Sequence, residues 1–199
     1  MAAVTINKKT EMITRSVTLC GLTDIMFDRY AGDNNTRLEP WQKLYFMPGN
    51  SKVIGLPALN IMSFLSAHNT NSAPKRLRDK RKYKDIANAN LSFVTIAPDF
   101  IPFIREGKPI EFGKFDKDVD PVSGIYIHYS VARLDKGIPN PKERPTLPTP
   151  WSLAFTLHYI PNREIQEQEI LNLFDEGGRA LGLGTFRGVF GKFTVDTWE

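Results

Sequence analysis

Cysteine is almost absent from this sequence, which holds one thiol, Cys20, in 199 residues. A single cysteine can form neither an internal disulfide nor a multi-thiolate zinc site, so disulfide-stabilised secreted domains and zinc fingers are excluded. No segment approaches the ~18 consecutive apolar residues of a membrane span, and residues 1–10 lack the apolar core of a signal peptide. We therefore expect a cytoplasmic protein, in a bacterial or a virus-infected cell, with no membrane partner.

Catalytic and metal-binding signatures are also scarce. The sequence has three histidines and carries neither the His-Glu-x-x-His motif of zinc proteases nor a nucleophile elbow. Asp116, Asp118 and Asp120 alternate with other residues, but they lack the glycine and the terminal glutamate of a calcium loop. We interpret them as a solvated acidic turn and expect neither a metal nor any other cofactor.

Positive charge is concentrated in one short segment, although the net charge of +4 and the isoelectric point of about 9.1 are only mildly basic. Seven of the ten residues from 75 to 84 are basic: Lys75, Arg76, Arg78, Lys80, Arg81, Lys82 and Lys84. This run lacks apolar periodicity and has almost no acidic partners, so folding does not explain it. We interpret residues 69–90 as an inserted, flexible basic arm that contacts nucleic-acid phosphates, with a solvated charged surface as the alternative.

The remaining pattern predicts alternating strands and helices. Apolar residues recur with the period of two that is typical of half-buried strands over 12–22, 124–134 and 151–159. Helical spacing predicts helices over 56–68 and from 161–162 to 181, and weaker signals predict a hairpin over 42–54 and strands over 91–97 and 193–198. Residues 135–150 hold five prolines and predict an inserted Pro-rich loop.

Without its insertions, this order of elements is β-α-β-β-α-β. We therefore predict a single domain, residues 1–199, of the α+β class, with a ferredoxin-like (RRM-like) antiparallel sheet and insertions that include the basic loop. In such a unit both helices cover one face of the sheet and leave the other face free for a ligand.

Four glycines, Gly182, Gly184, Gly188 and Gly191, fall within ten residues between the last predicted helix and the last predicted strand. Glycine permits positive φ, and successive amide groups in such a loop can converge on an anion, with Arg187 and Lys192 adding full charges. The spacing matches neither a Walker loop nor a Rossmann loop. Two interpretations follow: a helix cap with a bulged strand start, or a loop that also binds a polyanion through Gly182, Gly184, Arg187, Gly188 and Lys192.

A glycine-rich loop between the second helix and the last strand of a ferredoxin-like unit resembles the RAMP superfamily, the RNA-binding subunits of CRISPR complexes. Residues 144–198 are also similar to a group of phage and prophage proteins, through Arg-Pro, a Trp, a helix, Gly-Leu-Gly, an Arg and Gly-x-Phe-Gly-x-Phe. The resemblance implies that the protein binds single-stranded nucleic acid, with RNA the first candidate. It also implies side-by-side assembly along the strand, with other copies or with other subunits.

Three functions remain open from the sequence. We favour a non-catalytic protein that binds single-stranded RNA or DNA through the basic run, the glycine loop, His128 and His158. The second is a metal-independent endoribonuclease of RAMP type, in which these histidines share the polar face of neighbouring strands as acid and base, near Tyr126 and Lys192. The third is a viral structural or assembly protein that contacts the genome.

Overall fold

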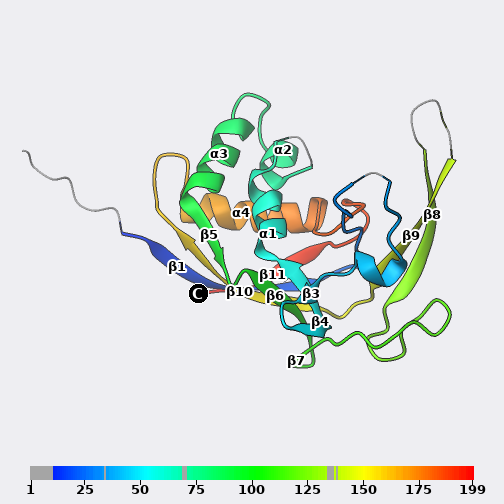
Figure 1. Cartoon of the computed structure of the whole chain (residues 1–199). Helices are drawn as coiled ribbons and strands as arrows, with labels where there is room; N and C mark the ends of the chain where they lie inside the picture. Colours follow the sequence, from blue (N-terminus) through cyan, green and yellow to red (C-terminus); the bar gives the residue numbers. More distant parts are fainter. Residues whose placement is uncertain (1–10, 34, 69–70, 134–136, 138) are drawn as a thin grey trace, which may run out of the picture.

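The computed structural model describes residues 11–33, 35–68, 71–133, 137 and 139–199. Its main feature is an eight-stranded sheet whose pairings are all antiparallel, with helices over one face (Figure 1). The strand order is β11-β1-β10-β6-β4-β3, while β5 also pairs with β10 and β7 with β6. In chain order these strands are β1 (Ile13–Gly21), β3 (Phe46–Met47), β4 (Asn50–Pro57), β5 (Val94–Ala97), β6 (Phe100–Arg105), β7 (Lys108–Pro109), β10 (Ser152–Tyr159) and β11 (Phe193–Trp198).

A second sheet of three strands lies beside the first, in the order β2-β9-β8. Its strands are β2 (Ile25–Met26), β8 (Tyr126–Arg133) and β9 (Pro139–Leu147). The helices of the described chain are the short 3₁₀ helix η1 (Pro40–Lys43) and α1 (Ala58–Ser66), α2 (Ala73–Leu77), α3 (Tyr83–Phe93) and α4 (Glu167–Ala180). None of the helices in these ranges is long and apolar enough to cross a membrane. This mixed α/β architecture is compatible with the predicted ferredoxin-like fold.

The centre of the core forms between β1, β10 and α4, and the predicted strand over 151–159 is confirmed there. Odd-numbered residues of β10, such as Leu153 and Phe155, are buried, and the even-numbered residues face the other way. Leu19 and Val17 of β1 lie directly opposite these two residues in the register. Burying each such side chain contributes about 1.5–3 kcal/mol to the stability of the fold. The period of two therefore decides which face of the sheet turns toward the core.

Two adjacent glycines let α4 pack closely on its neighbours. A Cβ on Gly177 would lie 2.7 Å from Cζ of Phe64 in α1, and a Cβ on Gly178 would lie 2.6 Å from the carbonyl oxygen of Phe193 in β11. Each glycine costs roughly 1 kcal/mol of helix stability relative to alanine. The close approach of the helix to both neighbours accounts for their presence.

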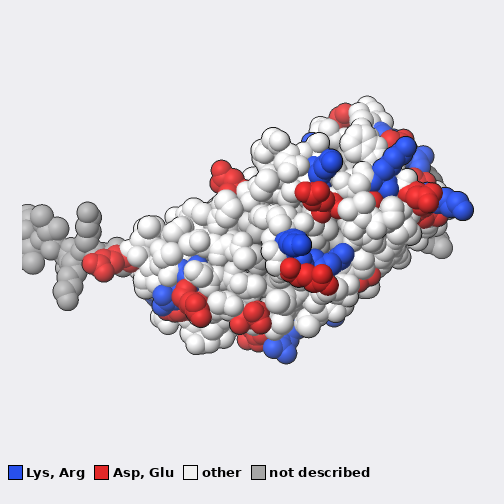
Figure 2. All heavy atoms as spheres, turned by 90° about the horizontal axis from the view of Figure 1, so that it is seen from below, with Lys and Arg blue, Asp and Glu red and all other residues white. Residues whose placement is uncertain are grey.

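The face of the large sheet opposite the helices is polar but carries little charge. The two central strands, β1 and β10, present mainly Thr, Ser and other small residues on this face, and no Phe, Tyr or Trp of either strand points outward there. Figure 2 views the molecule from this side; acidic and basic groups are scattered, and Lys and Arg gather mainly toward the end where the β8–β9 hairpin lies. A flat stacking platform of aromatic rings is therefore missing from the centre of the sheet.

The extended character expected for residues 135–150 is present, but the prediction of an irregular loop is wrong for most of its length, because Pro139–Leu147 forms β9 and pairs with β8 in an unbroken register. Pro139, Pro141 and Pro145 occupy alternate positions, so their missing N–H groups all lie on one edge of the strand. The carbonyl of Pro145 accepts a hydrogen bond from the N–H of Phe27, which places that edge on the side away from β8. Residues 135, 136 and 138 lie outside the described residues.

The expected start of the last helix at residues 161–162 is also wrong, because α4 begins at Glu167. Asn162 does accept two hydrogen bonds from backbone N–H groups, those of Glu164 and Ile165 at 2.9 and 3.0 Å. These bonds close a separate turn ahead of the helix, and this accounts for the cap-like signal in the sequence.

Glu167 joins the first turn of α4 to three strands, and this predicts a specific loss of stability in acid. Its carboxylate accepts hydrogen bonds from Arg15 at 2.6 and 2.9 Å, from Trp198 at 2.9 Å and from Tyr159 at 3.0 Å. These bonds, Arg15 first, lower the pKa of Glu167 from 4.5 to about 2. A carboxylate with a lowered pKa stabilises the fold above its unfolded pKa, and this contribution is lost as the pH falls toward the folded value.

We therefore expect the thermal stability of the wild type to exceed that of Glu167→Gln at neutral pH. The difference should shrink as the pH falls from about 4.5 to about 2. Melting curves of both proteins across this range test the expectation, and a difference independent of pH would contradict it.

Candidate nucleic-acid interface

The basic run is folded rather than flexible in the described part of residues 69–90; residues 69–70 lie outside it. Residues 73–77 form α2, with Ala73 and Pro74 buried, and α3 follows from Tyr83. Arg78, just after α2, donates to both carboxylate oxygens of Glu169 in α4 at 2.7 and 3.2 Å, and to Glu176 at 3.3 Å. One of the seven expected phosphate ligands is therefore used to hold α2 against α4.

The other six cations of the run remain on the surface. Lys75, Arg76, Lys80, Arg81, Lys82 and Lys84 are all exposed. The described residues supply no carboxylate within salt-bridge distance of any of them, and the Nζ of Lys75 donates to the carbonyl of His68 at 2.9 Å. Six exposed cations around α2 and its connection to α3 therefore outnumber the two exposed carboxylates of the same segment, Asp79 and Asp85, and form no ion pair among the described residues.

All four glycines of the glycine-rich loop have positive φ, between 72° and 91°. Three of them also touch other backbone: an added Cβ would lie 2.4 Å from the oxygen of Gly191 at Gly182, 2.5 Å from that of Met26 at Gly184, and 2.0 Å from that of Leu183 at Gly191. Gly188 has open space instead, with its nearest neighbour at 4.0 Å. The loop thus caps α4 and fastens it to the β1–β2 region.

Many amide groups of this loop are already used inside the protein. The N–H groups of Leu183, Thr185, Gly188 and Gly191 donate to carbonyls of Gly191, Met26, Leu181 and Asp24, respectively, at 2.6 to 2.9 Å. The backbone N–H of Lys192 donates to Oγ1 of Thr23. The side chain of Lys192 has no described partner. An anion would find few free amides here, so the geometry supports the structural interpretation of the glycines.

The guanidinium of Arg187 holds two segments of the protein together and is not free to bind a phosphate through both of its nitrogen pairs. Its Nη1 donates to the carbonyl of Asn71 at 2.6 Å and its Nε to the carbonyl of Gly184 at 3.2 Å. Burial lowers the pKa of the guanidinium below its ordinary value. These contacts tie the loop to the segment just before α2, so the glycine loop and the basic run lie side by side.

The two histidines proposed as an acid–base pair lie on different sheets, so the expectation that they share neighbouring strands is wrong. His128 is on β8 of the small sheet, where its ring meets Phe190 of the glycine loop edge-on at 5.3 Å. His158 is on β10 of the large sheet, with its Nδ1 2.9 Å from Oγ1 of Thr14. The order of the strands along the chain did not reveal that β8 and β10 belong to two different sheets.

Tyr126, two residues before His128 on β8, forms a half-buried hydrogen bond with Asp24. The Tyr126 hydroxyl donates to Oδ2 of Asp24 at 2.9 Å, and the other carboxylate oxygen accepts the N–H of Thr149 at 3.0 Å. Burial, followed by the contact with Asp24, raises the pKa of Tyr126 to about 12. A phenol held protonated to that pH is a hydrogen-bond donor rather than a base at neutral pH.

A group of cations beside the hairpin did not stand out in the sequence. A hollow of about 270 Å³ is lined by Arg29, Arg37, Lys43 and Lys142, together with Asp28 and Asp33. Lys43 lies deepest: its Nζ donates to the carbonyl of Glu143 at 2.5 Å, and burial is the main cause that lowers its pKa. The available signal was the alternation of Lys142 and Arg144 in residues 135–150, which becomes informative once that segment is known to be a strand.

No protein-family model and no curated protein sequence matches this chain. Among solved structures, it is similar to a chain in the cryo-EM structure of the Type III-B Cmr-beta bound to cognate target RNA. The TM-score is 0.55 at 11% sequence identity, and the match covers 95% of this chain and 60% of the other. This chain therefore corresponds to about three fifths of the length of the other. The likeness shows that the two chains share a fold, and it lends no support to the grouping with phage proteins.

The bracing role of Arg187 predicts that its removal destabilises the protein. Arg187→Ala leaves two backbone carbonyls without their charged donor. One bond to a charged group contributes about 1.5–3 kcal/mol, and because the bond to Asn71 is exposed to water, the two together are expected to contribute no more than one such bond. We expect a loss of about 1–3 kcal/mol in the free energy of unfolding, measured by urea titration. The control is Arg179→Ala, which removes only an exposed pair with Asp175 that is worth about 0.3–0.5 kcal/mol. Equal losses in the two variants would show that Arg187 does not brace the loop.

Proposed function

We propose that this protein is a non-catalytic, RAMP-like subunit that binds single-stranded nucleic acid, with RNA as the favoured ligand, and assembles along the strand. The observation that carries the proposal is the positive surface of Lys75, Arg76, Lys80, Arg81, Lys82 and Lys84, which has no carboxylate partner among the described residues. Such a surface attracts phosphates whatever the base sequence. The fold likeness to a chain of an RNA-bound structure is in line with it.

The order of the sheet supports the RAMP-like assignment. The neighbours β11, β1, β10 and β5 correspond to strands 4, 1, 3 and 2 of a β-α-β-β-α-β unit, with α1 and α4 as its two helices. In this correspondence, β6 continues strand 2 along the same edge of β10, and β4 and β3 widen the sheet beyond β6. Helices α2 and α3 are inserted before strand 2, and the β8–β9 hairpin is inserted after it. The glycine loop then joins the second helix to the last strand.

Contacts between these segments suggest the path of a bound strand. Arg187 connects the glycine loop to Asn71 beside α2, and Phe190 of the same loop touches His128 on β8. A strand could therefore pass from the cations at α2, over the glycine loop, to the basic hollow beside the hairpin. The small, uncharged side chains at the centre of the open sheet face offer less to a polyanion, so we place the path along the edge of the protein.

The two alternatives are less well supported. An endoribonuclease with His128 and His158 as its acid and base would need a large rearrangement, because these residues lie on separate sheets. A viral structural protein would also use exposed cations, but it should form stoichiometric particles without nucleic acid. Size-exclusion chromatography of the nucleic-acid-free protein separates this case from assembly on a strand.

The salt dependence of binding tests the role of the basic run. If five of its cations contact phosphates of a single strand, the logarithm of the affinity should fall with that of the salt concentration with a slope of about −3.5, from about −0.7 per contact. Replacing Lys80, Arg81 and Lys82 together with Gln should flatten the slope by about 2.

A variant of equal net charge is the control for this experiment. Gln replacements at Lys52, Lys108 and Lys117 also remove three exposed cations, but these residues lie outside the basic run. They should leave the slope nearly unchanged, measured by fluorescence anisotropy with a labelled oligonucleotide. Equal changes in the two triple variants would mean that only the overall charge matters, and the basic run would lose its assigned role.

We also expect the protein to bind without cutting. Labelled RNA and single-stranded DNA should remain intact on denaturing gels after incubation with the protein, with or without divalent metal ions. The physical reason is the separation of the two histidines, since general acid–base catalysis needs both groups at one 2′-hydroxyl. Cleavage that disappears in His128→Ala or in His158→Ala would favour the endoribonuclease instead.

A further inference from the structure

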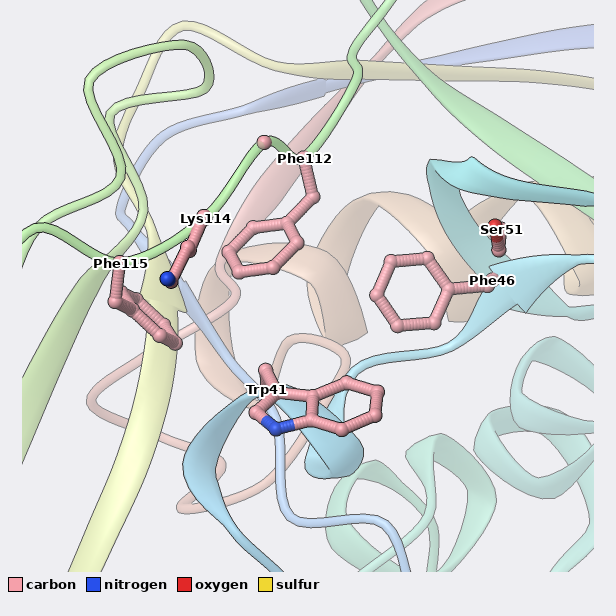
Figure 3. Close-up of a pocket in the computed structure, with 7 residues that line it drawn as sticks. Trp41, Phe46, Ser51, Phe112, Lys114 and Phe115 are labelled. Atoms are coloured by element: carbon pink, nitrogen blue, oxygen red, sulfur yellow. The ribbon is translucent and has the colours of Figure 1, made fainter.

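An aromatic pocket lies outside the glycine loop and the basic run. Its rings are Trp41 from η1, Phe46 from β3, and Phe112 and Phe115 from the segment after β7, and Lys114 lies between the last two (Figure 3). The volume of about 470 Å³ falls within the 300–1,000 Å³ that is typical of ligand pockets. In the sequence these residues lie in three separate segments, so no local pattern marked them.

The pocket has a rigid wall, because a buried carboxylate orders the segment that carries Phe112, Lys114 and Phe115. Asp120 accepts the backbone N–H groups of Gly113 and Lys114 at 3.1 and 3.2 Å, and it also accepts from Ser123. The rings of Phe112 and Phe115 then meet edge-on at 5.1 Å. This side of the pocket is therefore arranged in advance of any ligand, which lowers the entropic cost of binding.

The opposite wall is open to solvent. Trp41 keeps 49% of its surface exposed, whereas Phe112 keeps 8%. Trp41 and Phe46 also line a second hollow of about 280 Å³, whose other residues include Arg29. Arg29 in turn lines the basic hollow beside the hairpin, together with Lys43 and Lys142. The aromatic pocket is thus a neighbour of the cations assigned above to a nucleic-acid strand.

The chemistry of the lining selects an aromatic, anionic ligand. Four aromatic rings offer flat apolar surfaces, and the other lining residues, Ser51, Gly113 and Lys114, include no carboxylate. Lys114 is exposed and forms no ion pair with a carboxylate among the described residues. Single-stranded nucleic acids are bound by this same combination, with bases stacked on aromatic side chains and cations on the backbone. A purely apolar side chain of a protein partner would leave Lys114 unused.

We propose that this pocket, defined by Trp41, Phe46, Phe112, Phe115 and Lys114, takes one unstacked nucleobase of the bound single strand. Lys114 contacts the phosphate next to that base, and the following phosphates run toward Arg29 and the basic hollow. The proposal rests on the proposed function and adds a base-stacking site to its phosphate contacts.

The fluorescence of Trp41 provides a direct test. Of the three tryptophans, Trp151 is buried at 2% exposure and Trp198 is partly buried, whereas Trp41 is half exposed. Titration of the full chain with a 12-nucleotide oligouridylate or oligoadenylate should quench the emission of Trp41, and the quench should be absent in Trp41→Leu. In that variant, RNA affinity measured by anisotropy should fall about 5- to 150-fold, the range expected for the loss of one stacked base.

Matched variants separate stacking from general effects. Trp41→Phe keeps an aromatic ring and should retain most of the affinity, whereas Phe93→Leu removes a partly exposed ring outside the pocket and should change nothing. Lys114→Gln should flatten the salt slope by about 0.7, because one phosphate contact is lost. Melting curves confirm that each variant is folded.

The outcomes distinguish the two proposals. If no oligonucleotide binds, the proposed function fails and the pocket proposal fails with it. If RNA binds with the expected salt slope but Trp41→Leu keeps full affinity and emission is unchanged, only the pocket proposal is overturned. If Trp41→Leu instead weakens self-association without affecting RNA binding, the pocket takes a side chain of a second copy, and this result also overturns it.

Discussion

The contact between the glycine loop and the β1–β2 connection is the constraint on which the candidate interface depends. Thr185 and Gly191 donate their backbone N–H groups to the carbonyls of Met26 and Asp24, and Gly184 lies too close to Met26 to carry a side chain. Residue 184 must therefore be glycine on two grounds, positive φ and contact with backbone. Because the carboxylate of Asp24 also accepts a hydrogen bond from Tyr126 of β8, these contacts hold the small sheet against the large one.

The β8–β9 hairpin depends on a different feature: the three prolines of β9 all lie at odd-numbered positions. A strand tolerates proline only where its missing N–H is not needed for pairing, and in β9 the positions of Pro139, Pro141 and Pro145 all face away from β8. The intervening residues are left to pair with β8, and among them are Lys142 and Arg144. A strand rich in proline can therefore carry cations into the basic hollow and still keep a regular register with its neighbour.

Sequence periodicity predicted the elements whose stability is decided by neighbouring residues in the chain. The strands over 12–22 and 151–159 are examples, because alternation along each of them determines which side chains are buried. The prediction from periodicity failed where the interacting residue is distant in the sequence. The basic run appeared unpaired because Arg78 meets Glu169, which lies 91 residues later, and β9 was missed because its prolines are harmless only in a specific pairing. The aromatic pocket could not be predicted from the sequence for the same reason, since its rings come from three separate segments.

The net charge of +4 understates the positive field at the candidate interface, because many carboxylates are paired or hydrogen-bonded elsewhere and the charges are unevenly placed. Asp120 accepts backbone N–H groups, Glu167 joins α4 to three strands, and Glu169 holds Arg78. Charges interact over only about 8 Å at physiological salt, so a strand would feel the groups nearest to it rather than the total. Around α2 and its connection to α3 these are six exposed cations against two exposed carboxylates, Asp79 and Asp85, and this local excess of positive charge makes a mildly basic protein a candidate for binding a polyanion.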